Sequence, residues 1–335
     1  MAQAQDCRIV FMGTPDFAAV VLERLLCLER ARVACVYTQP DRPRGRGMRL
    51  VPSPVKTLAE GHGLEVRQPE NFRSAEERER LAALAPDLLV VAAYGLLLPG
   101  AVLDAARIAP LNVHASLLPR YRGAAPIQRA IMENWGPDAV TGVSLMRMEP
   151  SLDTGPVYAR KAVPIAGRTA GELTAVLARE GAELLAGTLD GIVAGTVAAV
   201  PQDASAATYA AKLSKADGQV DWKLPVARVD ALVRGVTPAP GGRARVMLQG
   251  AAEPLELRIL AGHAADASAE GTLPPAGSIA KVFGGLGVAC ADGFYMLDRV
   301  RPTGRKDMTG MDFANGYAPV RALGPEAPVP PGATA

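Results

Sequence analysis

The first half of the chain alternates two hydrophobic patterns, and this alternation restricts the possible folds more than any other feature. Short apolar runs such as residues 8–12 and 88–93 are typical of strands buried inside a sheet. Residues 16–28 carry apolar side chains at helical spacing, and Ser74 and Thr169 stand where helix N-terminal caps are expected. Strands alternating with helices predict an open, mostly parallel α/β sheet, in which ligands bind at the carboxyl ends of strands.

The second half of the 335-residue chain has a different pattern. Short strand candidates separated by glycine and proline follow residue 220, and their close spacing predicts a small β-barrel or sandwich. They are residues 245–248, 255–260, 278–283, 287–291 and 294–300, with a flexible loop expected over 263–275. We therefore expect a first domain over residues 1–200, a linker over 201–219, a second domain over 220–323 and a disordered tail over 324–335.

Composition excludes several classes of protein. Hydrophobic residues make up 49% and charged residues 21%, which is enough for ordinary cores and argues against global disorder. The formal net charge of +2 argues against general coating of nucleic acid, but it leaves room for a local basic patch. Neither a secretory signal nor an apolar run long enough to span a membrane is visible, so we expect no membrane association.

The cysteine pattern bears on metals and on the compartment. The chain has four cysteines and three histidines, and no Cys-x-x-Cys pair occurs. We therefore expect no metal site. Free thiols fit a reducing cytoplasm, where we expect the protein to act.

Cations are concentrated in one segment, residues 38–56. It contains a single acid, Asp41, and several prolines and glycines, and it lacks helical or strand periodicity. Its basic residues are Arg42, Arg44, Arg46, Arg49 and Lys56. A solvated loop is the simpler interpretation, but five cations in an otherwise balanced chain create a local field for phosphates. The segment therefore favours a nucleic-acid or phosphate contact.

Asn112 and His114 stand at the end of a predicted strand, two residues apart. Side chains at this spacing share one face of a strand, so both would point into the same cavity. An imidazole exchanges protons near neutral pH, and an asparagine amide donates hydrogen bonds to a developing oxyanion. A structural histidine remains the alternative for this pair alone.

Two further turns are informative. Asp153 lies in the turn Ser-Leu-Asp-Thr-Gly, where it either caps the turn or, beside a histidine, orients the ring and stabilises its cationic form. The first strand is followed by Gly13-Thr14-Pro15-Asp16, without the Gly-x-Gly-x-x-Gly fingerprint of dinucleotide binding. A nicotinamide-dependent oxidoreductase is therefore disfavoured.

Several motifs together resemble the methionyl-tRNA formyltransferase family over nearly the whole chain. They are Gly13 through Phe17, Thr38 through Pro43, Asn112 through Pro119, Arg122 through Gln128, Leu152 through Gly155, Leu213-Ser214-Lys215, Asp221-Trp222 and Met308 through Gly316. The resemblance implies a Rossmann-like N-terminal domain followed by a small OB-like barrel. It also implies 10-formyltetrahydrofolate as the formyl donor and methionine on initiator methionyl-tRNA as the acceptor.

The resemblance also implies roles for individual residues. Asn112, His114 and Asp153 match the catalytic trio of the family. The folate-binding positions correspond to Ser116, Leu117, Leu118, Pro119, Tyr94, Gly95, Leu96 and Leu97. The tRNA-binding positions are Arg42, Arg44, Arg46 and Arg49, and Arg46 matches the basic position of the loop that enters the acceptor stem. No subunit interface is indicated, so we expect a monomer.

Three other functions stay open as alternatives. The formyl acceptor is a different amine, such as an amino sugar or a purine precursor, although those enzymes do not need the basic segment. Alternatively, the chain is a non-catalytic RNA-binding protein on an α/β scaffold. The third is the disfavoured nicotinamide oxidoreductase.

Overall fold

A computed structural model describes residues 6–44, 48–266 and 273–325. The chain divides into two compact units. The first consists of Met1–Pro126, Val140–Pro164 and Leu173–Ala211. The second consists of Ile127–Ala139, Ile165–Glu172 and Lys212–Ala335. Most of the tail that the sequence predicts to be disordered lies outside the described residues.

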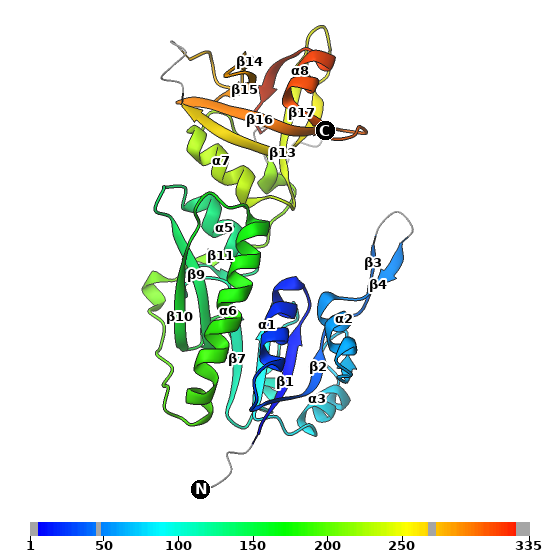
Figure 1. The fold of residues 1–335 in the computed structure, drawn as a ribbon, viewed down its shortest axis with the longest axis vertical. Coiled ribbons are helices and arrows are strands. Elements are labelled where there is room, and N and C mark those ends of the chain that lie inside the picture. Colours follow the sequence, from blue (N-terminus) through cyan, green and yellow to red (C-terminus); the bar gives the residue numbers. More distant parts are fainter. Residues whose placement is uncertain (1–5, 45–47, 267–272, 326–335) are drawn as a thin grey trace, which may run out of the picture. The chain divides into compact units, whose positions relative to one another are not determined.

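The first unit is built on one seven-stranded sheet, with the strand order β10-β9-β7-β6-β1-β2-β5 (Figure 1). The strands are β1 (Cys7–Gly13), β2 (Ala31–Tyr37), β5 (Val66–Arg67), β6 (Leu88–Ala92), β7 (Ala109–His114), β9 (Val140–Arg147) and β10 (Val157–Pro164). β5, β2, β1, β6 and β7 run parallel to one another. At one edge, β9 pairs antiparallel with β7, and β10 pairs antiparallel with β9. The predicted open, mostly parallel α/β sheet is confirmed.

The helices of this unit begin largely where the capping residues predict. They are α1 (Asp16–Leu26), α2 (Pro54–Gly61), α3 (Ala75–Ala82), α4 (Gly100–Leu103) and α6 (Ala170–Val193), whose first turn belongs to the second unit. Ser74 Oγ accepts a hydrogen bond from the Glu77 N–H at 3.2 Å, and Thr169 and Glu172 form a reciprocal capping box at the start of α6. α6 continues to Val193, beyond the end near residue 185 that the pattern predicts.

Apolar strands form the buried core of the sheet. All five residues of β6 are buried, as expected for a strand that is apolar on both faces. Each fully buried Leu or Val side chain contributes roughly 1.5–3 kcal/mol. Burial also raises the pKa of the Cys7 thiol to about 12 and that of the Cys35 thiol to about 11, so both stay protonated inside the core.

The basic segment forms a hairpin, although the sequence shows no strand periodicity there. β3 (Arg42–Arg44) pairs with β4 (Arg49–Val51) in antiparallel register, with Arg42 opposite Val51. Both strands are short, and Arg42, Leu50 and Val51 are exposed. A strand solvated on both faces has no apolar alternation, which explains why the pattern is invisible in the sequence.

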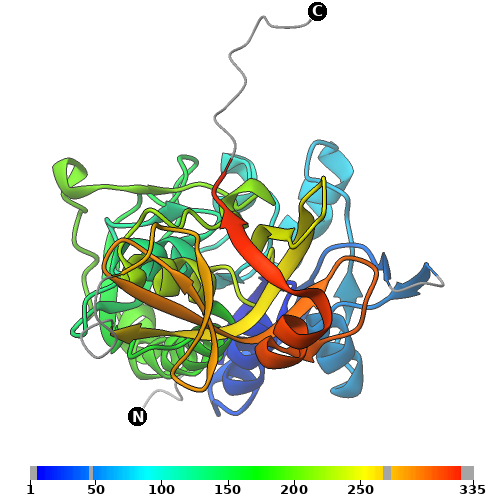
Figure 2. The ribbon, with the colours of Figure 1, turned by 90° about the horizontal axis from the view of Figure 1, so that it is seen from above.

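The second unit contains an antiparallel sheet with the order β14-β15-β16-β13-β12-β18, seen from above in Figure 2. Its strands are β12 (Gly242–Leu248), β13 (Leu255–Asp266), β14 (Ile279–Val282), β15 (Gly285–Ala289), β16 (Gly293–Pro302), β17 (Met308–Thr309) and β18 (Pro319–Leu323). A bridge between Ser278 and Arg321 joins the two edges, so the sheet curls on itself as a small barrel does. Each predicted strand is present. Residues 263–266, which were expected in a loop, instead extend β13, where they pair with β16.

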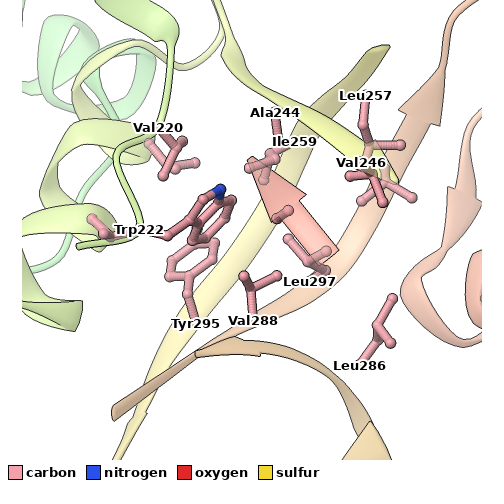
Figure 3. Close-up of a cluster of buried hydrophobic side chains, with 14 of the residues drawn as sticks. Val220, Trp222, Ala244, Val246, Leu257, Ile259, Leu286, Val288, Tyr295 and Leu297 are labelled. Atoms are coloured by element: carbon pink, nitrogen blue, oxygen red, sulfur yellow. The ribbon is translucent and has the colours of Figure 1, made fainter. Parts of the chain in front are cut away.

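A large apolar cluster forms the main core of the second unit (Figure 3). Trp222 and Tyr295 lie against each other with ring centroids 6.4 Å apart, and the inward-facing residues of the strands surround them. The helices of this unit are α5 (Pro126–Glu133), which begins in the first unit, α7 (Val226–Gly235) and α8 (Gly310–Tyr317). Among the described residues, no helix combines the length and apolar composition that a membrane crossing requires.

Candidate functional site

The two groups predicted at the strand end lie at the carboxyl end of β7, inside the first unit. Asn112 and His114 are buried, with relative solvent exposures of 9% and 6%. β7 lies between the parallel strand β6 and the antiparallel strand β9, where His114 stands opposite Ser144. Because Asn112 and His114 alternate with Val113, they share one face of the strand.

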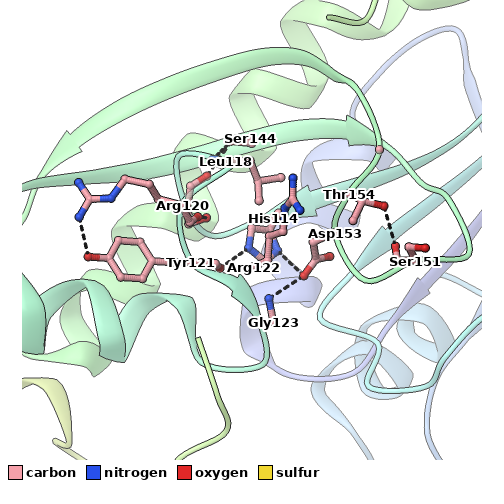
Figure 4. Close-up of polar contacts among 12 residues, drawn as sticks. His114, Leu118, Arg120, Tyr121, Arg122, Gly123, Ser144, Ser151, Asp153 and Thr154 are labelled. Carbon is pink, nitrogen blue, oxygen red and sulfur yellow. Dashed lines mark hydrogen bonds and ion pairs between the residues drawn. The ribbon is translucent and has the colours of Figure 1, made fainter. Parts of the chain in front are cut away.

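His114 lies between two hydrogen-bond acceptors (Figure 4). Its Nε2 atom is 3.0 Å from the carbonyl oxygen of Tyr121, so this nitrogen donates. Its Nδ1 atom is 3.7 Å from Oδ2 of Asp153, within ion-pair distance. The structure thus brings together the histidine and the aspartate, which the sequence alone leaves far apart.

The turn that carries Asp153 has an unusual backbone. Asp153 has φ +53°, the left-handed conformation that non-glycine residues rarely adopt. Its Oδ2 atom accepts a hydrogen bond of 2.8 Å from the Gly123 N–H, which fixes the carboxylate beside the imidazole (Figure 4). Gly155 follows in the same turn, and a Cβ atom there would lie 2.0 Å from the Arg147 carbonyl oxygen. The turn therefore requires glycine at this position.

The segment Ser116–Pro119 follows β7 and is held by side chains from β9 and β10. Ser144 Oγ accepts a hydrogen bond from the Leu118 N–H at 3.0 Å and donates one to the Ser116 carbonyl at 2.7 Å. Arg160 Nε donates to the Leu118 carbonyl at 2.7 Å. The backbone of this segment is consequently fixed before any ligand binds.

Burial divides the four residues of this segment into two pairs. Ser116 and Leu118 are buried, and Leu118 packs with Met146 and Val157 in a small apolar cluster. The other two members are half-buried. The buried pair therefore shapes the segment from inside, whereas Leu117 and Pro119 present surface that a ligand can contact.

The second segment that the resemblance connects with folate, Tyr94–Leu97, follows β6. The Tyr94 carbonyl accepts hydrogen bonds from Thr14 Oγ1 at 2.9 Å and from Gln39 Nε2 at 3.1 Å. Tyr94 itself is buried, which raises the pKa of its phenol, whereas Leu97 is 82% exposed. Since β6 and β7 are parallel neighbours, this segment and Asn112 emerge at the same edge of the sheet.

Two of the four predicted tRNA-binding arginines are described in full. Arg42 and Arg49 are exposed on the hairpin. Arg46 lies outside the described residues, and Arg44 is described only through its backbone in β3. The hairpin therefore presents exposed cations, but the structure does not describe the position that matches the family's stem-contacting residue.

The base of the hairpin is anchored by Asp41. Its carboxylate accepts hydrogen bonds from Lys56 Nζ and Gln68 Nε2, both at 2.8 Å. These two contacts, Lys56 first, hold the pKa of Asp41 below its ordinary value of 3.8. The only acid of the segment is thus engaged at the base of the hairpin. It therefore does not neutralise the positive charges of the arginines beyond it.

Some groups at the site leave no signal in the sequence. The Tyr121 carbonyl and the Gly123 N–H are backbone groups, which every residue type supplies. Ser144 lies on β9, a strand whose residues Val140–Arg147 show no clear alternation of apolar and polar types. Two residues that the sequence assigns to a linker, Gln202 and Thr208, hydrogen-bond to this same site. The Thr208 side chain accepts from the Tyr121 N–H at 2.8 Å.

Most of the chain matches known protein families. Residues 7–189 match the family described as Formyl transferase, and residues 212–318 match its C-terminal domain. The methionyl-tRNA formyltransferase of Desulfovibrio desulfuricans is 51% identical over 320 residues, covering 94% of both chains.

Two solved structures share the fold at low identity. One is the N-formyltransferase of Helicobacter canadensis, in complex with folinic acid and dTDP-3-aminofucose. It has a TM-score of 0.61 at 14% identity and covers 90% of this chain and all of that one, 100%. The other is HypX of Aquifex aeolicus in complex with tetrahydrofolic acid, with a TM-score of 0.59 at 17% identity. It covers 92% of this chain, which spans only 47% of HypX.

Proposed function

This chain belongs to the formyl transferase family, and from that membership we propose the reaction that its site performs. It transfers the formyl group of 10-formyltetrahydrofolate to the α-amino group of methionine on initiator methionyl-tRNA, producing N-formylmethionyl-tRNA for translation initiation. The observation that carries this function is the 51% identity to a methionyl-tRNA formyltransferase over 94% of both chains.

The chemistry needs a stabilised tetrahedral intermediate. The neutral amine of methionine attacks the formyl carbon, and a new C–N bond forms while the carbonyl oxygen becomes an oxyanion. The bond between the formyl carbon and N10 of the folate then breaks, and the proton lost by the amine reaches N10, directly or through water. Donors aimed at the oxyanion are the main contribution that a protein makes to such a reaction.

We assign the stabilisation of the oxyanion to the Asn112 amide, which donates a hydrogen bond, and to the imidazolium charge of His114. Both are buried at the end of β7, where water competes little for their hydrogen bonds. Asp153 holds the imidazole through Nδ1 at 3.7 Å, and its own position is set by the Gly123 N–H. The mechanism as proposed uses no metal.

We place the folate between the two segments that follow β6 and β7, Tyr94–Leu97 and Ser116–Pro119. Their adjacency in the parallel sheet and their fixed backbones support this placement. The half-buried Leu117 and the exposed Leu97 offer apolar surface for the flat rings of a folate. Measurements of folate binding by variants of these residues test this placement.

We propose that tRNA reaches the site along the basic hairpin and contacts the second domain as well. The hairpin arginines support the first contact. In the second unit, Arg243, Arg258 and Arg301 stand directly opposite one another on β12, β13 and β16, so they share one face of that sheet. Asp307 pairs with Arg301 and leaves that end of the row less positive.

Two further properties follow from this assignment as proposals. The product of the proposed reaction is used in translation initiation, and the four cysteines are free thiols. Both points support a cytoplasmic location. We also propose that the protein acts as a monomer, with the domain boundaries predicted above. Light scattering on the purified protein measures the molar mass and tests the monomer directly.

The choice of acceptor is tested by a formylation assay with 10-formyltetrahydrofolate. Charged initiator methionyl-tRNA is compared with an amino sugar nucleotide and with glycinamide ribonucleotide. We expect formyl transfer to the tRNA and none above background to the two small amines. Transfer to either small amine in preference to the tRNA would overturn the proposed function, and RNA binding without any formyl product would favour the non-catalytic alternative.

A further inference from the structure

Gln202 closes a ring of hydrogen bonds around the Asp153 turn. Its Nε2 atom donates to the Asp153 carbonyl at 2.9 Å and to the Gly155 carbonyl at 2.7 Å. Its Oε1 atom accepts from Arg122 through Nε at 3.2 Å and Nη2 at 2.8 Å. Arg122 directly precedes Gly123, whose N–H binds the Asp153 carboxylate. The two segments are thus joined twice, once through the carboxylate and once through Gln202.

The chemistry of these contacts fits a carboxamide side chain. Two carbonyl oxygens require two donors, and a guanidinium requires an acceptor. A carboxamide supplies all of these at the end of one side chain, in a single orientation. A glutamate in the same place would keep the contact to Arg122, but it would set a carboxylate oxygen against two carbonyl oxygens.

The turn that Gln202 holds has a strained backbone. Asp153 stands at φ +53°, and such a backbone persists only where its surroundings over-determine it. Gln202 binds the carbonyls on both sides of the Thr154 residue, immediately after the strained position. Release of these carbonyls would let the turn relax, and the carboxylate would leave the imidazole.

We propose that Gln202 is a positioning residue for formyl transfer, which acts by holding Asp153 in place beside His114. This inference rests on the proposed function of Asp153. It also gives Gln202 a part in the chemistry, although the sequence assigns this residue to a linker. Because Gln202 touches neither the imidazole nor the carboxylate, its effect reaches the reaction only through the turn.

The test is a double-mutant cycle with Gln202→Glu and Asp153→Ala, in which formylation of initiator methionyl-tRNA is measured under steady-state conditions. In the wild-type background we expect kcat to fall on the order of 10- to 100-fold, as when a catalytic group is displaced by about 1 Å. KM for both substrates should stay within about 3-fold. In the Asp153→Ala background the same change should lower kcat by less than about 3-fold, because its target is already absent.

Two controls separate positioning from folding. Asp203→Asn changes the neighbouring residue, whose carboxylate accepts hydrogen bonds from Ser205 at the start of the short helix η1 (Ala204–Ala206). Its kcat should match that of the wild type. Gln202→Met removes the polar contacts without adding charge and serves if Gln202→Glu does not fold. Circular dichroism and binding of 5-formyltetrahydrofolate establish the folded fraction of each variant.

Three results would overturn the inference. They are an unchanged kcat in the folded Gln202 variants, an equal loss in both backgrounds, and a loss confined to KM. Failure of the proposed function is distinguishable, since the wild-type protein itself would then produce no formylmethionyl-tRNA.

Discussion

The end of β7 and the basic hairpin belong to the same unit, but they are built in opposite ways. At the strand end, His114 is buried and has an acceptor at each ring nitrogen. On the hairpin, Arg42 and Arg49 are exposed, and the hydrogen bonds are concentrated at its base around Asp41. A reacting centre requires fixed donors, whereas a polyanion is attracted by charge that acts over the Debye length of about 8 Å. Substitutions in the two regions should therefore have different effects.

The largest effect should come from removing a donor at the strand end. We expect Asn112→Ala to lower kcat on the order of 100- to 1000-fold, because an oxyanion donor acts mainly in the transition state. KM for the tRNA and for the folate should change little. Steady-state kinetics of formylation measure both parameters. A rise in KM with kcat preserved would mean that Asn112 binds substrate, and the contrast with the hairpin would disappear.

The scaffold of the strand end should be sensitive as well. Ser144→Ala leaves the Leu118 N–H and the Ser116 carbonyl without their partner in a fully buried place. We expect the free energy of unfolding to fall by about 1–3 kcal/mol. Urea denaturation measures it, with Ser205→Ala on the exposed helix η1 as the control, for which about 0.5 kcal/mol or less is expected. Equal losses in the two variants would show that the strand end is no more tightly built than the surface.

A change on the hairpin should affect binding and leave the chemical step intact. We expect Arg49→Ala to raise KM for initiator methionyl-tRNA a few-fold at physiological salt, with kcat preserved. The slope of log KM against log salt should become shallower by about 0.7 to 0.9, the contribution of one phosphate contact. Arg32→Ala removes one charge at the amino end of β2, whereas the hairpin follows the carboxyl end of that strand, and it serves as the control. An unchanged salt dependence in Arg49→Ala would reject the hairpin as a tRNA contact.

The smallest effect concerns the hairpin anchor. Hydrogen bonds from Lys56 and then Gln68 hold the pKa of Asp41 below 3.8, so the folded state favours the carboxylate. The stabilisation of the hairpin base is thus present above the unfolded pKa and is lost as the pH falls through the lower folded value. We expect the Asp41 carboxyl resonance in NMR to titrate below 3.8. A midpoint at or above 3.8 would mean that the anchor does not form in solution.

Much of the first unit is readable from its sequence for physical reasons. The strand β6 is apolar on both faces because helices cover both faces of a parallel sheet, and Ser74 caps α3 because the first amides of a helix need acceptors. Asn112 and His114 are readable as a pair because strand geometry places alternate side chains together. In the second unit, every predicted strand is present for the same reason of local pattern.

The remaining features depend on contacts between distant residues. The contact of His114 with Asp153 arises from the order of β7, β9 and β10, which no local pattern encodes. The Gly123 N–H is a backbone group without a sequence signature. Gln202 lies in a stretch that resembles a linker because it has no periodicity, yet its side chain reaches the Asp153 turn. The hairpin strands could not be predicted from the sequence, because neither face of the hairpin is buried and no apolar alternation results.

The central claim is that the strand end performs formyl transfer and that His114 takes part in the chemical step. The most direct measurement is the single-turnover rate of transfer from 10-formyltetrahydrofolate to initiator methionyl-tRNA, with saturating enzyme, for the wild type and for His114→Ala. We predict formylmethionyl-tRNA from the wild type and a rate on the order of 100- to 1000-fold lower in the folded variant. Equal rates in the two proteins, or no product from the wild type, would contradict the claim.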